Sequence, residues 1–210
     1  MKVTDEQYVD GLYGEDADLA RTKKGIAEKG MPDISISDGY GRLLTMLVQL
    51  AGAKNVLEIG ALGGYSGICL ARGLGEGGQL TSLELKSEYA DVALAHMKEA
   101  GFGEAVEYVI GDAKESLAQL KEEGRRFDFF FIDADKDGYP VYLDYAIQLA
   151  NPGAVIVGDN VLLRGRTINP EKGGPAVLSV RAFNERIASD ERLTSTVLPG
   201  YDGLAIAIVK

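Results

Sequence analysis

The 210-residue chain contains a single cysteine, a single histidine and no tryptophan. The lone cysteine, Cys69, excludes an internal disulfide, and its place in the apolar stretch GICLA indicates a small core residue rather than a nucleophile. The lone histidine, His96, lies in the helical pattern VALAHMKEA, where we expect an ordinary packing or surface role. One histidine gives no sound basis for a His-based zinc site or a Ser-His triad.

Long apolar runs and an excess of positive charge are also missing. No stretch of about 20 apolar residues suggests a membrane span. The opening MKVTDEQYVDGLYGEDADLA is acidic where a signal peptide has a basic start and an apolar middle. The formal net charge of -10 argues against a polyanionic partner, which normally needs a Lys/Arg surface. We therefore expect a cytoplasmic protein that binds neither nucleic acid nor a membrane.

The chain suits one compact domain, because 46% of its residues are hydrophobic and its length allows a sizeable core. Helical spacing predicts three N-terminal helices, over residues 5–13, 16–30 and 37–52. Ser37 is the expected N-cap of the third. We expect a single domain over residues 1–210, in which residues 1–50 form a helical segment that contributes to the substrate site and residues 51–210 form an α/β core.

Strand and helix patterns alternate through that core. Buried strands are expected at residues 55–60, 79–85, 106–111, 127–133 and 154–159, and helices at residues 87–101, 113–124 and 139–150. Such alternation predicts an α/β fold with a mostly parallel sheet and helices on both faces. A helix over residues 175–190 then leads into two β-rich runs, 192–199 and 204–210, joined by a short turn. These runs predict a C-terminal antiparallel hairpin.

The first strand runs into a glycine-rich turn, VLEIGALGGYSG, at the end of the sheet where open α/β folds bind ligands. A dinucleotide site needs glycine where Leu62 stands, and Glu58 would repel a pyrophosphate. A ligand with an ammonium and a single carboxylate fits better. Glu58 would then face the ammonium, directly or through water, while Ser66 and the turn backbone take the carboxylate.

The next two strands end in residues suited to an adenosine. Glu84 ends the second strand, where an acidic side chain can accept both ribose hydroxyls. Asp112 and Ala113 follow the third strand and could border a flat base, although Asp112 could equally cap the following helix. An adenosine with an amino-acid tail is S-adenosylmethionine.

Carboxylates also end the fourth and fifth strands. Asp133 closes the run FFFID, and Asp159 with Asn160 follows AVIVG. If these two strands are neighbours, three oxygen ligands converge at one edge of the sheet. Such a set suits Mg²⁺, with Mn²⁺ or Ca²⁺ as alternatives, and leaves coordination positions for two adjacent oxygens of a substrate.

Several stretches together resemble the cation-dependent class I O-methyltransferases, the catechol and caffeoyl-coenzyme A O-methyltransferase family in its small bacterial form. The resemblance is carried by VLEIGALGGYSG, LELKSEYADVA, GDAKESL, FDFFFIDADKDGYPVYLD and VGDNVLLRGR, and extends from MPDISIS to the C-terminus. It implies a Rossmann-like, seven-stranded sheet whose last strand is antiparallel, and a homodimer, since homodimers are common in that family.

The resemblance also implies roles for individual residues. It assigns to the cofactor S-adenosylmethionine the residues Ile36, Glu58, Gly60, Ala61, Ser66, Glu84, Ala113 and Asp135. It assigns Asp133, Asp159 and Asn160 to a divalent metal and Lys136 to catalysis. In such chemistry the metal stabilises a phenolate, and the lysine assists it or removes its proton.

The acceptor is less well specified. The polar, glycine-rich segment 162–174 is expected to form a mobile wall of the site, in which Arg164 and Arg166 either bind an acidic tail or stay solvated. Because the chain starts close to its first helix, we expect a free catechol-like phenol rather than a coenzyme A ester. Two alternatives are a nicotinamide dehydrogenase, which Leu62 disfavours, and an S-adenosylmethionine-binding protein without turnover, which the complete set of candidate catalytic residues disfavours.

Overall fold

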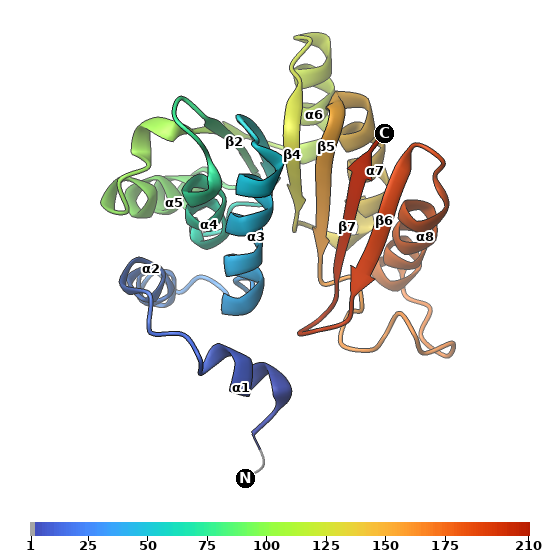
Figure 1. The fold of residues 1–210 in the computed structure, drawn as a ribbon, viewed down its shortest axis with the longest axis horizontal. Helices are drawn as coiled ribbons and strands as arrows, with labels where there is room; N and C mark the ends of the chain where they lie inside the picture. Colours follow the sequence, from blue (N-terminus) through green and yellow to red (C-terminus); the bar gives the residue numbers. More distant parts are fainter. Residues whose placement is uncertain (1–2) are drawn as a thin grey trace.

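The structure, a computed structural model, describes residues 3–210. Its centre is a seven-stranded sheet in the order β3-β2-β1-β4-β5-β7-β6 (Figure 1). The strands are β1 (Asn55–Ile59), β2 (Gln79–Glu84), β3 (Val106–Ile110), β4 (Phe127–Ile132), β5 (Ala150–Asp159), β6 (Leu193–Leu198) and β7 (Leu204–Val209). Among these strands, β7 alone runs in the direction opposite to the other six. The predicted fold class, with its C-terminal hairpin, is confirmed.

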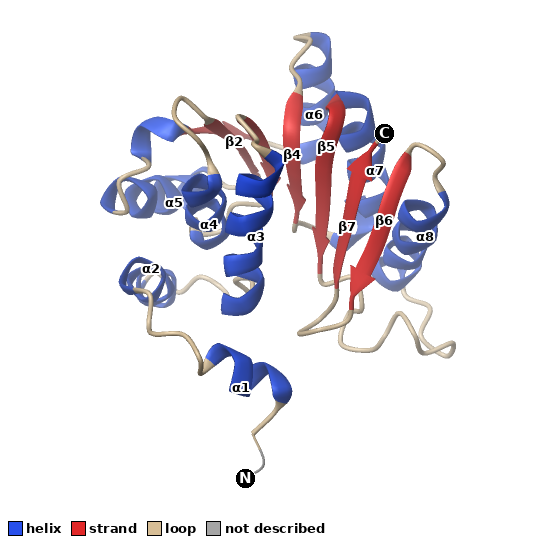
Figure 2. Cartoon of the chain, viewed as in Figure 1, coloured by secondary structure: helices blue, strands red, loops and turns tan. Residues whose placement is uncertain are grey.

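Helices cover both faces of this sheet (Figure 2). They are α1 (Asp5–Asp10), α2 (Ala17–Glu28), α3 (Asp38–Ala51), α4 (Tyr65–Gly73), α5 (Ser87–Glu99), α6 (Ala113–Glu122), α7 (Tyr139–Leu149) and α8 (Pro175–Ser189). One face packs against α3, α4 and α5, and the other against α6, α7 and α8. In β4, Phe129 and Phe131 point to the first face while Phe130 and Ile132 point to the second. This double burial explains why the strand is an unbroken apolar run.

Local signals place the element boundaries. The Ser37 hydroxyl accepts a hydrogen bond from the Tyr40 amide at 3.4 Å, which confirms the predicted cap of α3. Asp112 caps α6 by accepting from the Lys114 amide at 2.8 Å. The boundary of β5 differs from the prediction, because the strand begins at Ala150 rather than at residue 154. Ala150 pairs with Phe127 ahead of a register shift, and a bulged strand start of this kind has no clear hydrophobic period.

The first helix, α1, has no buried residues and contacts the rest of the chain through polar side chains. In Figure 1, α1 lies at the edge of the molecule, beyond α2 and α3. Asp10, the last residue of α1, accepts from Arg42 of α3 at 2.6 Å and from the Tyr201 hydroxyl at 3.0 Å. The N-terminal segment is thereby joined to the turn between β6 and β7. Across residues 3–210, no helix is long and apolar enough to cross a membrane.

Candidate active site

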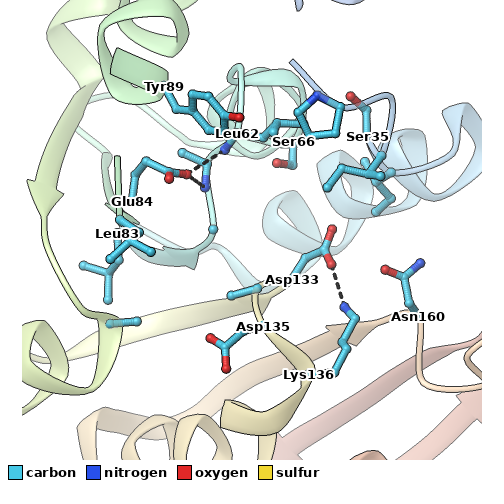
Figure 3. Close-up of a pocket in the computed structure, with 18 of the residues that line it drawn as sticks. Ser35, Leu62, Ser66, Leu83, Glu84, Tyr89, Asp133, Asp135, Lys136 and Asn160 are labelled. Atoms are coloured by element: carbon cyan, nitrogen blue, oxygen red, sulfur yellow. Dashed lines mark hydrogen bonds and ion pairs between the residues drawn. The ribbon is translucent and has the colours of Figure 1, made fainter. Parts of the chain in front are cut away.

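A cavity of about 770 Å³ lies at the carboxyl ends of the parallel strands (Figure 3). The sequence-predicted site residues that line it are Ile36, Gly60, Ala61, Ser66, Glu84, Ala113, Asp133, Asp135, Lys136 and Asn160. Glu58 and Asp159 do not line it and lie deeper. Predicted residues from six separate stretches of the chain therefore surround one cavity, and all but Ile36 are there because the ends of adjacent parallel strands meet at the same edge.

The glycine-rich turn after β1 forms the floor between two strand ends. Gly60 has φ +98°, and a Cβ atom there would lie 2.2 Å from the carbonyl oxygen of Asp133. Only glycine allows the ends of β1 and β4 to approach this closely. Leu62, in the same turn, also has a left-handed backbone, with φ +48°. Its amide is turned toward Glu84.

Glu84 is tied to this turn through its carboxylate. Oε2 accepts from the amides of Ala61 at 3.2 Å and Leu62 at 3.0 Å, and Oε1 accepts from the Lys86 amide at 3.1 Å. Figure 3 shows the carboxylate directed at the turn, beside Tyr89. The side chain is only 8% exposed. Glu84 is therefore both a wall of the cavity and the acceptor that holds the glycine turn in place.

Glu58 lies beneath the cavity rather than in its wall. The carboxylate is fully buried and accepts from the hydroxyls of Ser66 at 2.6 Å and Ser82 at 2.5 Å. Burial raises the pKa of Glu58 to about 7. Ser66 separates Glu58 from the cavity, so Glu58 can influence a ligand through the Ser66 hydroxyl.

Three predicted metal ligands and Lys136 converge where β4 and β5 end. Ile132 pairs with Gly158, so Asp133 and Asp159 follow side by side. Asp133 Oδ1 lies 2.9 Å from Lys136 Nζ, as drawn in Figure 3. Asp159 is 3% exposed and accepts from the Asn160 amide at 2.7 Å.

The chemistry of this donor set fits a divalent cation. Burial and the nearby carboxylate of Asp133 raise the pKa of Asp159 to about 7, and a bound cation would offset that repulsion. Within residues 3–210, no three His, Cys, Asp or Glu side chains form a cluster that could hold a metal. A metal here would thus need the amide oxygen of Asn160 as its third protein ligand.

Two tyrosines of α7 take part in the site and were not predicted from the sequence. The Tyr142 hydroxyl donates to Asp135, which also accepts from the Gly138 amide at 2.9 Å. The buried Tyr139 hydroxyl contacts Lys136 Nζ at 2.5 Å. Their spacing of three residues places both on one face of a helix that directly follows DADKDG, and this was the available signal.

Loops enclose the other side of the cavity. Residues 32–36, Leu163, Arg164, Arg166 and Asp202 line it. Both arginines are exposed, and Asp202 accepts from the Arg164 amide at 2.5 Å. Arg181 of α8 donates to the carbonyl oxygens of Thr167 at 2.8 Å and Asn169 at 2.5 Å. The predicted wall of the site is thus fastened to α8 by one arginine.

The two residues expected to have structural roles are both buried. Cys69 lies in the core, where burial raises the pKa of its thiol to about 12. His96 Nδ1 lies 2.8 Å from the Gly63 carbonyl oxygen. Its ring also occupies the space beside Gly25, where a Cβ atom would come within 2.2 Å of Nε2. His96 therefore packs α5 against α2 and the glycine turn.

Comparisons with known proteins place the chain in a family. A family model described as O-methyltransferase matches residues 12–210. A catechol O-methyltransferase of Niastella koreensis is 41% identical over 98% of this chain and 96% of that protein. A catechol O-methyltransferase of Mycobacterium tuberculosis is 38% identical over 95% of this chain and 91% of that protein. The crystal structure of an O-methyltransferase from Bacillus cereus in complex with SAH has a TM-score of 0.91 at 42% identity, covering 98% of this chain and 96% of that chain. The predicted family and enzyme class are confirmed, and the chain belongs to the O-methyltransferase family.

Proposed function

We propose that this protein transfers the methyl group of S-adenosylmethionine to one hydroxyl of a catechol-like phenol, with the help of a divalent metal. The observation that carries the proposal is that the glycine turn with Glu84, and Asp133 with Lys136 and Asn160, line one cavity. Support comes from the SAH in the similar Bacillus cereus structure and from the catechol O-methyltransferases among the relatives.

The cofactor half of the cavity suits a sulfonium cofactor with an adenosine and an amino-acid tail. Glu84 is held by three backbone amides, so its carboxylate is oriented before a ribose arrives. Asp135 is oriented by Tyr142 and the Gly138 amide on the opposite wall. The Ser66 hydroxyl donates a hydrogen bond to Glu58 and lines the cavity, where it would contact the amino-acid tail of the cofactor. Ile36 and Ala113 supply apolar surface.

In the acceptor half, the chain must produce an oxyanion and hold it in line with the S–CH₃ bond. Asp133, Asp159 and Asn160 would hold Mg²⁺, or Mn²⁺ or Ca²⁺, and the cation would lower the pKa of an acceptor hydroxyl while leaving coordination positions for the substrate. Lys136 lines the same region and provides an ammonium for the developing phenolate. Transfer then breaks the S–CH₃ bond and forms an O–CH₃ bond, S-adenosylhomocysteine leaves, and the hydroxyl proton leaves to solvent.

A product assay tests this function. The protein is incubated with S-adenosylmethionine, Mg²⁺ and a panel of catechols, with matched monophenols as the control substrates, and methylated products are detected by mass. We expect singly methylated catechols, loss of turnover on chelation, and recovery with Mg²⁺. Asp159→Asn should abolish this turnover, whereas Asp137→Asn, at an exposed position outside the cavity, should not. Equal turnover of monophenols, or full turnover after exhaustive chelation, would contradict the proposal.

The protein is further proposed to act as a cytoplasmic homodimer. The supporting feature is a set of exposed apolar side chains: Met46 and Leu50 on α3 and Ile208 on β7 are 55%, 80% and 49% exposed. Light scattering after gel filtration measures the mass. Leu50→Glu should shift a dimer to a monomer, and Leu178→Glu on α8 is the matched control. A monomeric wild type would refute the dimer without affecting the proposed chemistry.

A further inference from the structure

Tyr139 occupies a buried position directly behind the candidate catalytic residue. It begins α7 and its side chain is fully buried. Its hydroxyl lies 2.5 Å from Lys136 Nζ, 2.8 Å from the carbonyl oxygen of Asp159 and 3.2 Å from the carbonyl oxygen of Ile132. A single hydroxyl therefore connects the ends of β4 and β5 with the lysine.

The direction of each hydrogen bond follows from the groups involved. Backbone carbonyl oxygens can only accept, so the tyrosine proton is donated toward Asp159, the nearer of the two carbonyls. A lysine ammonium can only donate, so Lys136 Nζ donates to a lone pair of the Tyr139 oxygen. The orientation of the hydroxyl is thus fixed by the sheet, and it can act as a rigid acceptor for the lysine.

This contact sets the direction of the ammonium. Of its three N–H groups, one is donated to Asp133 Oδ1 at 2.9 Å and one to Tyr139. The third is available to the cavity that Lys136 lines. Asp133 is also a proposed metal ligand, so its carboxylate would serve both the metal and Lys136. The Tyr139 hydroxyl, in contrast, hydrogen-bonds to one charged group, Lys136.

We propose that Tyr139 is a positioning residue, which acts through Lys136 by fixing the ammonium so that one N–H points at the acceptor oxygen. The inference rests on the proposed function, because it takes Lys136 as the group beside that oxygen. A flexible four-carbon side chain gains orientation from a second fixed partner. Small errors in the placement of reacting groups have large effects on rate.

A double-mutant cycle tests the proposal. Turnover is measured for the wild type, Tyr139→Phe, Lys136→Ala and the double variant, each saturated with S-adenosylmethionine, Mg²⁺ and a catechol. We expect Tyr139→Phe to lower kcat about tenfold or more with little change in cofactor affinity by calorimetry. In the Lys136→Ala background the same change should lower kcat less than about twofold, because the path through the lysine is already lost. Tyr145→Phe, on the same helix but outside the cavity, is the matched control and should leave kcat unchanged.

Two results overturn the inference. Wild-type kcat in Tyr139→Phe removes any positioning role. An equal loss of kcat in both backgrounds shows that Tyr139 acts through the strand ends and not through Lys136.

A second measurement tests the contact between Tyr139 and Lys136 without using turnover, so it still applies if a variant does not fold or if the proposed function is wrong. The ¹⁵N ammonium signal of Lys136, assigned by its loss in Lys136→Ala, should report a restrained group in the wild type, unlike exposed Lys121. In Tyr139→Phe the restraint should weaken, because only the contact with Asp133 remains. If Tyr139→Phe does not fold, a mobile wild-type ammonium alone refutes the positioning. If Lys136→Ala keeps full turnover, the proposed role of Lys136 in catalysis fails, while this signal still decides whether Tyr139 holds it.

Discussion

Replacing Glu58 with glutamine should change how stability depends on pH. Glu58 is fully buried and accepts hydrogen bonds from Ser66 and Ser82, with one serine at each carboxylate oxygen. Burial raises the pKa of Glu58 from its ordinary value of 4.5 to about 7. Glu58→Gln keeps the shape and the hydrogen-bonding groups of the protonated acid, but it cannot ionise.

The sign of the effect follows from the two states. Below pH 4.5, the Glu58 carboxyl group is protonated in both the folded and the unfolded state, so it does not make the free energy of unfolding depend on pH. Between 4.5 and about 7, the unfolded chain releases the proton while the folded chain keeps it, so unfolding becomes more favourable as pH rises. At about 1.4 kcal/mol per pH unit, the wild type loses about 3 kcal/mol over this window, and the loss ends once the folded state also ionises.

Urea unfolding at pH 5, 6, 7 and 8 measures this directly. Glu58→Gln and the wild type should differ by less than about 1 kcal/mol at pH 5, and the variant should be more stable by about 2 to 3 kcal/mol at pH 8. Asp159 also titrates near 7, but it does so in both proteins and cancels in the comparison. Glu122→Gln, at an exposed position of α6, should stay within about 0.5 kcal/mol of the wild type throughout. The reasoning is refuted if the difference for Glu58→Gln does not grow with pH while the urea dependence of both proteins is the same.

Three further outcomes are expected. Glu84→Ala removes the acceptor for two amides of the glycine turn, so calorimetry should show S-adenosylmethionine binding at least about tenfold weaker, with stability lower by about 1 to 3 kcal/mol. Gly60→Ala places a Cβ atom 2.2 Å from the Asp133 carbonyl oxygen at a left-handed backbone position and should destabilise the protein by more than about 2 kcal/mol in urea, while Gly75→Ala, with open space around it, should not. Chelation should abolish turnover but change cofactor affinity less than about threefold by calorimetry, and an equal loss of both would contradict separate metal and cofactor sites.

The sequence predicts the residues at strand ends well because their positions depend on local structure. Strands alternate with helices, and parallel strands bring their carboxyl ends to one edge. Glu84, Asp133 and Asn160 are therefore placed near one another once the strands and their order are known, and all three line the cavity. The roles of the cofactor and metal residues remain predictions that the experiments above address.

The sequence does not predict which way a side chain turns when that depends on tertiary packing. Glu84 is identified from its strand end, but its hydrogen bonds to the glycine turn come from the approach of β1 and β2. The sequence predicts that Glu58 faces the ligand, yet Ser66 of α4 lies between it and the cavity. Tyr139 fits an apolar helix face, and only the packing of α7 shows that its hydroxyl meets Lys136.

The two halves of the cavity are built from different kinds of structure, one from strand ends and the other from loops. We therefore expect changes in the choice of substrate to be possible without changes in the reacting groups. Apart from Ile36, the residues proposed to bind the cofactor and the metal follow strands of one sheet, so their relative positions are set by strand pairing and by close approaches such as that of Gly60 to Asp133. The opposite wall, which we propose receives the acceptor, is built from loops that are distant in sequence: residues 32–35, residues 162–166 and the turn at Asp202. Asp202 joins two of them by accepting from the amides of Leu162 and Arg164. Changes in these loops can alter the shape and charge of the acceptor wall while the strand ends stay in place. We therefore expect the choice of acceptor to depend on these loops, whose arrangement cannot be read from any one stretch of sequence.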